Sequence, residues 1–269
     1  MTERRKCFRE RLSNDQALFG VMQAHPNSLI TDLASVCGYD FLFLDGEHGL
    51  FGLGDYADAL RALKASGEDI LAMVRPPNHD PHLIGLYLDM GMDIIAVPNV
   101  TTRTEAEMLM RAMEYPPGGN RGVGAAMHRV TRYGTEAASY HSDSRNGAGL
   151  IVIIESQLGA ANADEILSVD GVDGAIIGLA DLSTDLGCYG DYRHPDYLSA
   201  FAEIERAATT NQKLLGTVPH GNNSIESLYD RGHRLFILAS DVSLVREAMT
   251  TKLSMARDAL INEQGTNVR

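Results

Sequence analysis

The stretch Phe41-Leu42-Phe43-Leu44-Asp45-Gly46-Glu47-His48 joins an apolar run directly to a polar turn. Four large apolar residues bounded by a turn are typical of a buried β-strand. Two carboxylates and an imidazole follow at once, where that strand would end. Polar side chains at the carboxyl ends of strands in an α/β barrel usually serve chemistry rather than stability. The stretch therefore predicts a strand of a parallel sheet together with part of a catalytic site.

Other apolar runs end in the same way, since Arg75 follows residues 70–74, Glu155 follows residues 150–154 and Asp181 lies just beyond residues 174–178. Strand-like runs occur near residues 18–22, 41–45, 70–75, 94–98, 150–155, 174–178, 214–218 and 235–239. Between these runs, apolar residues recur at the three- and four-residue spacings of a helix, for example over residues 55–65, 102–113, 160–167 and 197–209. Eight such units favour a closed (β/α)8 (TIM) barrel over an open doubly wound sheet.

Length and composition bound the remaining possibilities. The 269 residues, 44% of them apolar, can bury one full core, and no linker or repeat divides them, so we expect a single α/β domain over residues 1–269. A net charge of -13 without a basic stripe argues against nucleic acid as a partner. No apolar stretch is long enough to cross a membrane. Three widely spaced cysteines without a CxxC motif predict a reducing, cytoplasmic environment.

The segment from residue 114 to residue 149 is long and rich in glycine, and it carries Arg121, Arg129 and Arg132. Long loops in compact domains are often functional. Because we place it after the fourth strand, one hypothesis is that it closes over an anionic substrate. The alternative is a solvated surface loop.

Glu155 and Asp181 come from neighbouring strands and offer oxygen ligands without any paired histidine or cysteine. Such a set suits a hard divalent ion that keeps several waters, so we expect Mg²⁺, Mn²⁺ or Co²⁺. A bound 2-keto acid would be polarised there.

His48 is the natural proton carrier, because its unperturbed pKa lies near neutrality, and Asp45 could orient it. Arg75 would face a developing enolate oxygen or a carboxylate. Each residue alone also has a purely structural interpretation, such as a helix cap. An imine mechanism needs a lysine facing the substrate, and none of the four is placed for it: Lys6, Lys64, Lys213 and Lys252.

Several motifs together resemble the HpcH/HpaI aldolases, the metal-dependent class II pyruvate aldolases related to 4-hydroxy-2-oxoheptanedioate aldolase and 2-dehydro-3-deoxyglucarate aldolase. The resemblance spans about residues 19–249. The motifs are Leu44-Asp45-Gly46-Glu47-His48, Val74-Arg75-Pro76, Leu88-Asp89-Met90-Gly91, Tyr115-Pro116-Pro117 through Arg121-Gly122-Val123-Gly124, Glu155-Ser156, and Asp170 to Gly174 through Gly178 to Ser183.

The resemblance implies roles for particular positions. Metal ligation falls to Glu155 and Asp181, the base to His48 with Asp45, and pyruvate binding to Arg75. It further implies a supporting acid at Asp89 and a loop whose backbone N–H groups meet the substrate carboxylate, including Gly178, Ala180 and Asp181. It also implies a hexamer in which C-terminal helices contact neighbouring subunits.

Two positions depart from the family pattern. Leu179 stands where relatives usually have proline, which removes a backbone constraint from the predicted metal loop. His220 stands after the seventh strand where relatives tend to be apolar, and we expect it to contact the variable end of the substrate.

We therefore predict a lyase that reversibly cleaves a 4-hydroxy-2-keto acid into pyruvate and an aldehyde. An alternative uses the same enolate machinery for oxaloacetate decarboxylation, with or without carbon–carbon bond formation, as in macrophomate synthase. A silent barrel that only binds a small acid fits less well, because Asp45, His48, Arg75, Glu155 and Asp181 are all present.

Overall fold

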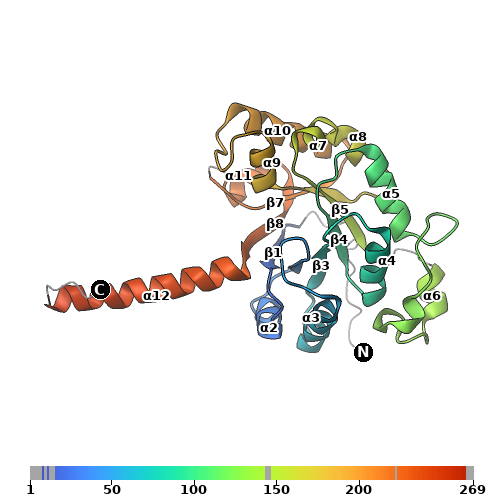
Figure 1. The fold of residues 1–269 in the computed structure, drawn as a ribbon, viewed down its shortest axis with the longest axis horizontal. Helices are drawn as coiled ribbons and strands as arrows, with labels where there is room; N and C mark the ends of the chain where they lie inside the picture. Colours follow the sequence, from blue (N-terminus) through green and yellow to red (C-terminus); the bar gives the residue numbers. More distant parts are fainter. Residues whose placement is uncertain (1–7, 9–10, 12–15, 143–146, 222, 265–269) are drawn as a thin grey trace.

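The protein forms a closed barrel of parallel strands, each followed by helical structure, in a computed structural model that describes residues 8, 11, 16–142, 147–221 and 223–264 (Figure 1). The strands pair in chain order and the last pairs with the first, which confirms the predicted (β/α)8 fold. They are β1 (Leu18–Gln23), β2 (Phe41–Asp45), β3 (Leu71–Arg75), β4 (Ile94–Val97), β5 (Gly149–Ile154), β6 (Gly174–Ile177), β7 (Leu214–Thr217) and β8 (His233–Ser240).

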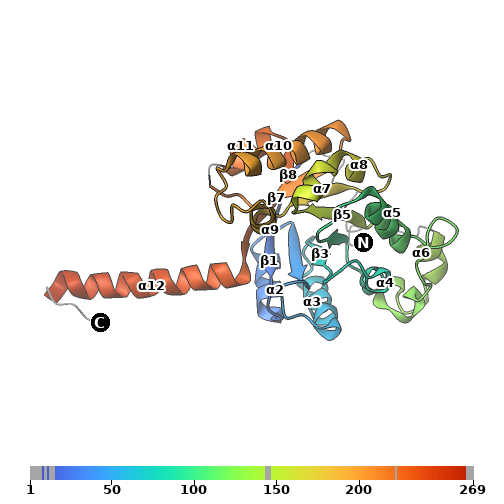
Figure 2. The same ribbon diagram turned by 45° about the horizontal axis from the view of Figure 1, so that its top comes forward.

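Apart from the last of them, the helices lie around the outside of the barrel (Figure 2). They are α2 (Ser28–Val36), α3 (Leu53–Ser66), α4 (Pro81–Met90), α5 (Arg103–Met113), α6 (Ala137–Ser142), α7 (Gln157–Ala161), α8 (Ala163–Leu167), α9 (Leu179–Asp185), α10 (Pro195–Thr210), α11 (Ile225–Asp230) and α12 (Asp241–Gln264), with short 3-10 turns η1 (Ala125–Met127) and η2 (Arg129–Thr131). The one helix expected over residues 160–167 is two, because Asn162 breaks the run and its side chain donates to Thr101 O at 2.8 Å.

Both faces of the strands are buried, which explains why they are continuous apolar runs rather than alternating ones. Alternate side chains fill the barrel interior, as Phe41, Phe43, Leu71 and Met73 do, and the others pack against the helices. Phe8 is fully buried in the same interior cluster. The filled interior leaves the strand ends as the place for chemistry.

The long segment after α5, described over residues 114–142 and 147–149, is not where the sequence suggested. It follows α5 and leads into β5, so it connects a helix to the next strand and lies at the amino-terminal end of the barrel. Loops at that end serve stability rather than catalysis in this fold. Arg121 is buried and Arg132 pairs with Glu136, so neither supports the hypothesis of a loop closing over the substrate.

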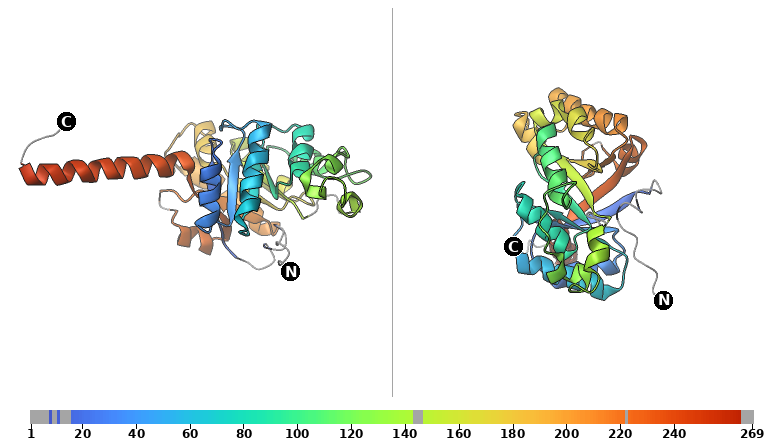
Figure 3. Two further views of the ribbon diagram at one scale, coloured as in Figure 1. Left: turned by 90° about the horizontal axis from the view of Figure 1, so that it is seen from below. Right: turned by 90° about the vertical axis from the view of Figure 1, so that its right-hand side faces the viewer.

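The last helix, α12, extends away from the barrel instead of packing along it (Figures 1 and 3). Most of its apolar side chains are exposed, including Val245, Met249 and Leu253. Across the described ranges of the chain, no helix combines the length and apolar character needed to cross a membrane.

Candidate active site

The turn after β2 is held by its neighbour β3. The N–H of Gly46 donates to Arg75 O at 2.8 Å. A Cβ at position 46 would lie 2.7 Å from Arg75 O and closer still to the buried hydroxyl of Tyr56, so only glycine fits. This close approach aims the side chains on either side of Gly46 at the mouth of the barrel.

Asp45 and Arg75 form a two-pronged ion pair at the ends of adjacent strands. Arg75 Nε and Nη2 donate to the two carboxylate oxygens of Asp45, each at 2.8 Å, and Arg75 Nη1 lies 3.0 Å from Glu47 Oε2. Burial raises the pKa of Asp45, but the guanidinium and the backbone N–H groups of His48 and Glu47 more than offset it, so the pKa is lowered. Asp45 is therefore an ionised anchor for Arg75.

His48 is oriented differently from the sequence expectation. Asp45 accepts the backbone N–H of His48 at 3.3 Å, not its imidazole. The imidazole is 64% exposed, with Nε2 3.8 Å from Glu47 Oε2. The acid beside the predicted base is thus Glu47, while Asp45 shapes the turn that carries both.

Glu155 follows β5 and is buried at the mouth of the barrel. Its Oε1 accepts the backbone N–H of Asn99 at 2.8 Å, and Asn99 adopts the left-handed conformation with φ of 46°. Burial raises the pKa of Glu155 to about 7, and the charges of Glu47 and Asp181 act in the same direction. A carboxyl destabilised by two neighbouring carboxylates is one that a cation would stabilise.

The turn from β6 into α9 packs closely against the side chain of Glu155. A Cβ on Gly178 would lie 2.7 Å from Glu155 Cβ and closer still to Glu155 Oε2. Asp181 stands in the first turn of α9, exposed to solvent, and Ala180 is exposed beside it. Leu179 takes the first helical position, where proline is also favoured, and its side chain packs into the core. The helix thus forms without the proline of the family pattern.

The donor set fits a hard divalent cation. Glu155 and Asp181 are close enough for their charges to interact, because the charge of Asp181 contributes to the raised pKa of Glu155 and also to that of Glu47. No group of three or more His, Cys, Asp or Glu side chains with metal-binding geometry occurs within the described ranges. Two carboxylates and open positions for water and substrate are the pattern expected for Mg²⁺ or Mn²⁺.

Asp89 lies away from this group. It stands in the last turn of α4, next to the start of β4, and therefore at the opposite end of the barrel from the strand ends. It pairs with the buried guanidinium of Arg121, which also donates to Tyr140 Oη at 3.1 Å. In this chain Asp89 joins α4 to the segment of residues 114–149.

His220 follows β7 and is held inside an aromatic cluster. Its Nδ1 lies 2.9 Å from Val218 O and its Nε2 3.0 Å from Tyr197 Oη, with the ring of Tyr192 edge-on at 4.7 Å. Burial lowers its pKa. Both ring nitrogens are engaged, so the imidazole is positioned by the protein rather than presented to a ligand.

Two residues of the site were not assigned roles from the sequence. Glu47 contacts Arg75 and lies beside His48, and Asn99 directs its N–H to Glu155. Glu47 belongs to the quoted turn and Asn99 follows β4 directly after Pro98, so position at a strand end was the available signal for both.

Comparison with known proteins agrees with this architecture. The family model described as HpcH/HpaI aldolase/citrate lyase matches residues 19–248. The chain is 34% identical over 238 residues to hydroxypyruvate/pyruvate aldolase of Roseobacter denitrificans, covering 88% of this chain and 92% of that one. It is 34% identical over 247 residues to 5-keto-4-deoxy-D-glucarate aldolase of Escherichia coli, covering 92% and 94%.

Solved structures match as well. An HpcH/HpaI aldolase/citrate lyase family protein from Burkholderia cenocepacia superposes with a TM-score of 0.87 at 29% identity, covering 92% of this chain and 98% of that one. Macrophomate synthase superposes with a TM-score of 0.84 at 25% identity, covering 98% and 93%.

Proposed function

The chain belongs to the HpcH/HpaI aldolase/citrate lyase family and is a carbon–carbon lyase, and on that premise we propose that it reversibly cleaves a 4-hydroxy-2-keto acid into pyruvate and an aldehyde with a divalent cation. The observation that carries the proposal is the position of Glu155. Its carboxyl is buried among other carboxylates beside Arg75, and its pKa is raised to about 7. Such a group is poised to exchange its proton for a cation.

Glu155 and Asp181 would hold the cation, which supplies a Lewis acid that polarises the keto group of the substrate. Glu155 Oε1 is fixed by the N–H of Asn99, so Oε2 is the oxygen left for this ligand role. The N–H of Gly178 donates to Ile154 O at 3.1 Å, so the backbone N–H groups of Ala180 and Asp181, in the first turn of α9, would receive the substrate carboxylate.

Arg75 would stabilise negative charge on the developing enolate oxygen. Within the described part of the chain, its contacts with Asp45 and Glu47 engage three of the five guanidinium N–H groups, which leaves two to donate to substrate. The bidentate pair with Asp45 prevents the guanidinium from rotating. Because both groups are largely buried, the charge acts at short range without screening by water.

His48 would take the proton from the C4 hydroxyl as the carbon–carbon bond breaks, and return it in the reverse direction. Its exposed imidazole stands at the mouth, where an incoming aldehyde would lie. Glu47 lies beside it, with Oε2 3.8 Å from His48 Nε2. In the cleavage direction the protonated His48 would then deliver this proton to C3 of the enolate, so that pyruvate leaves as the keto acid and the neutral imidazole is restored.

A second candidate reaction is favoured by the structural likeness to macrophomate synthase. The same residues would stabilise the enolate formed when oxaloacetate loses carbon dioxide, with or without a following carbon–carbon bond formation. Measuring oxaloacetate consumption beside aldol cleavage separates the two reactions.

The test of the proposal is pyruvate release, coupled to lactate dehydrogenase, from a panel of 4-hydroxy-2-keto acids. EDTA-treated protein should be inactive and should recover with Mg²⁺, Mn²⁺ or Co²⁺. Asp181→Asn should lose activity, whereas Glu226→Gln should keep it, because each acid stands in the first turn of a short helix and only Asp181 lies beside Glu155. Full turnover after EDTA treatment would contradict the cation requirement.

We further infer a homo-oligomer, in which α12 packs on a second copy. A groove of about 610 Å³ lies on the barrel between α2, β1 and the start of α12, lined by apolar side chains such as Ile30 and Leu33. The exposed apolar residues of α12 complement it in character. The hexamer implied by the family predicts a particle of six times the chain mass in light scattering.

The cytoplasm is the proposed location. It is supported by Cys37 and Cys188, which are both free thiols.

A further inference from the structure

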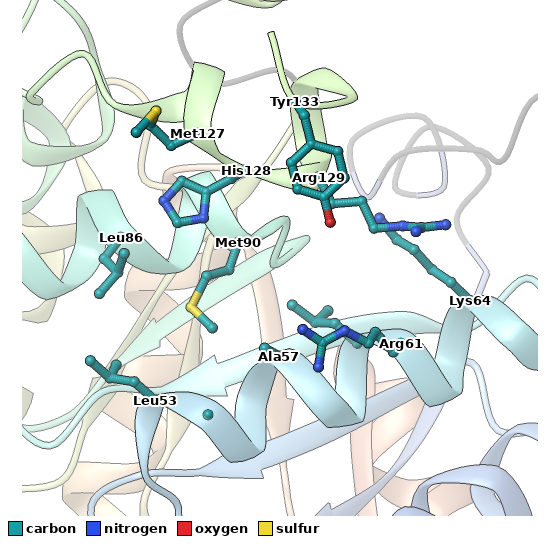
Figure 4. Close-up of a pocket in the computed structure, with 12 residues that line it drawn as sticks. Leu53, Ala57, Arg61, Lys64, Leu86, Met90, Met127, His128, Arg129 and Tyr133 are labelled. Atoms are coloured by element: carbon teal, nitrogen blue, oxygen red, sulfur yellow. The ribbon is translucent and has the colours of Figure 1, made fainter.

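A second cavity lies on the outside of the barrel, away from the strand ends. It is a groove of about 430 Å³ between α3 and α4, covered by residues 127–133 (Figure 4). This volume is in the range of small-molecule sites. The groove shares no residue with the candidate active site.

The charge of the groove is opposite to that of the protein. Arg61 and Lys64 line it from α3, and His128 and Arg129 line it from the covering segment. None of its lining residues is Asp or Glu, although the chain as a whole has a net charge of -13. Arg61 also pairs with Asp58 on its own helix, outside the lining. A local cluster of cations on an acidic protein attracts small anions and repels cations.

The remaining lining is apolar. Leu60, Leu86 and Met90 lie along the groove, and Met127 and Tyr133 stand at its edge although they are 80% and 68% exposed. In Figure 4 the side chains of Met90 and Arg61 lie on one side of the groove, and those of His128, Arg129 and Tyr133 lie on the other. A ligand that satisfied both features would carry an apolar body and an anionic group.

Hydrogen bonds fix the backbone at the edge of the groove where Tyr133 lies. Tyr133 adopts a left-handed backbone conformation with φ of 55°, which is unusual for an aromatic residue. Its N–H donates to His128 O at 3.0 Å, and Thr131 Oγ1 donates to Ala125 O at 2.7 Å while accepting the N–H of Gly134 at 3.0 Å. These bonds fix the backbone that carries Tyr133 at the edge of the groove.

We propose that this groove is a binding site for a small organic anion with a flat apolar body, such as an aryl carboxylate, sulfonate or phosphate, and that it is separate from the active site. The cations would contact the anionic group, and the methionine, leucine and tyrosine side chains would cover the ring. Flexible methionines suit ligands of somewhat variable shape. The proposal stands independently of the proposed aldolase chemistry.

The test uses 8-anilinonaphthalene-1-sulfonate as the probe and the full-length protein. The probe should bind with saturable fluorescence that weakens as salt rises. The double variant Arg61→Gln, Arg129→Gln should weaken binding about tenfold or more, since it removes the charged partners of the sulfonate. Arg206→Gln is the matched control, because Arg206 pairs with an acid three residues away as Arg61 does but lies outside the groove.

A second variant tests the apolar part without changing charge. Ala57→Leu places a larger side chain in the groove on a helix that tolerates leucine, so it should also reduce probe binding. All variants should keep the melting temperature and the rate of pyruvate release of the parent protein. Probe binding that is unchanged in both the charge variant and Ala57→Leu, or absent in the parent protein, would overturn the proposal.

Discussion

Gly178→Ala gives the sharpest test of how the candidate site is built. The backbone at Gly178 has φ of -84° and ψ of 100°, a conformation that alanine adopts without strain. The added methyl would nevertheless lie 2.7 Å from Glu155 Cβ and closer still to Oε2. The substitution therefore displaces Glu155, and because the Cβ of Glu155 is fixed to the backbone, the turn at Gly178 or the end of β5 must shift with it.

The size of the effect follows from that geometry. Carbon atoms in contact normally lie about 3.5–4.0 Å apart, so Glu155 must move by about 1 Å. A shift of that size at a reacting group costs about 10²-fold in rate, or about 2.7 kcal/mol of transition-state stabilisation. Overpacking also lowers the free energy of unfolding by about 1–3 kcal/mol, which thermal melting would measure separately.

The assay combines Mn²⁺ affinity, measured by titration of the EDTA-treated protein, with kcat/KM for pyruvate release. Gly178→Ala should weaken both. Gly54→Ala is the control, because its Cβ would meet nothing within 4 Å and it lies inside α3. Alanine there should stabilise the protein by about 0.5–1 kcal/mol and leave activity unchanged. Unchanged Mn²⁺ affinity in Gly178→Ala would refute the assignment of Glu155 Oε2 as the cation ligand.

Three further outcomes follow from the same geometry. The pKa of Glu155 rises from 4.5 to about 7 in the cation-free fold, so its stability contribution is present below pH 4.5 and lost as pH rises through 7. Glu155→Gln should therefore raise the melting temperature above pH 7 but not below pH 4.5, and equal effects at both would contradict this. Arg75→Lys should lower kcat/KM about 10²-fold or more, because lysine cannot form the bidentate pair with Asp45. Steady-state kinetics measures this, and an unchanged kcat/KM would contradict the role given to Arg75. Met249→Glu, on the exposed face of α12, should reduce the particle mass in light scattering while the far-UV circular dichroism spectrum stays unchanged. An unchanged particle mass would argue against α12 as the contact between subunits.

The sequence by itself determined the fold and the end of the barrel at which the candidate site lies. Runs such as residues 41–44 and 150–154 are apolar throughout because both faces of a barrel strand are buried, and that pattern is visible without coordinates. Because parallel strands end at one edge, the residues at or directly after their ends, Asp45, Arg75 and Glu155, had to lie near one another.

Only the tertiary structure decided which of these groups are partners. The order of residues in the chain does not predict that Asp45 accepts two hydrogen bonds from Arg75, or that Glu47 lies beside His48. Both contacts depend on the directions of side chains at the ends of two strands. The position of Asp89 depends on which end of α4 carries it. The raised pKa of Glu155 depends first on burial in the closed barrel and then on carboxylates far away in the sequence. Local periodicity is encoded in neighbouring residues, whereas distances, burial and charge coupling arise only when the barrel closes.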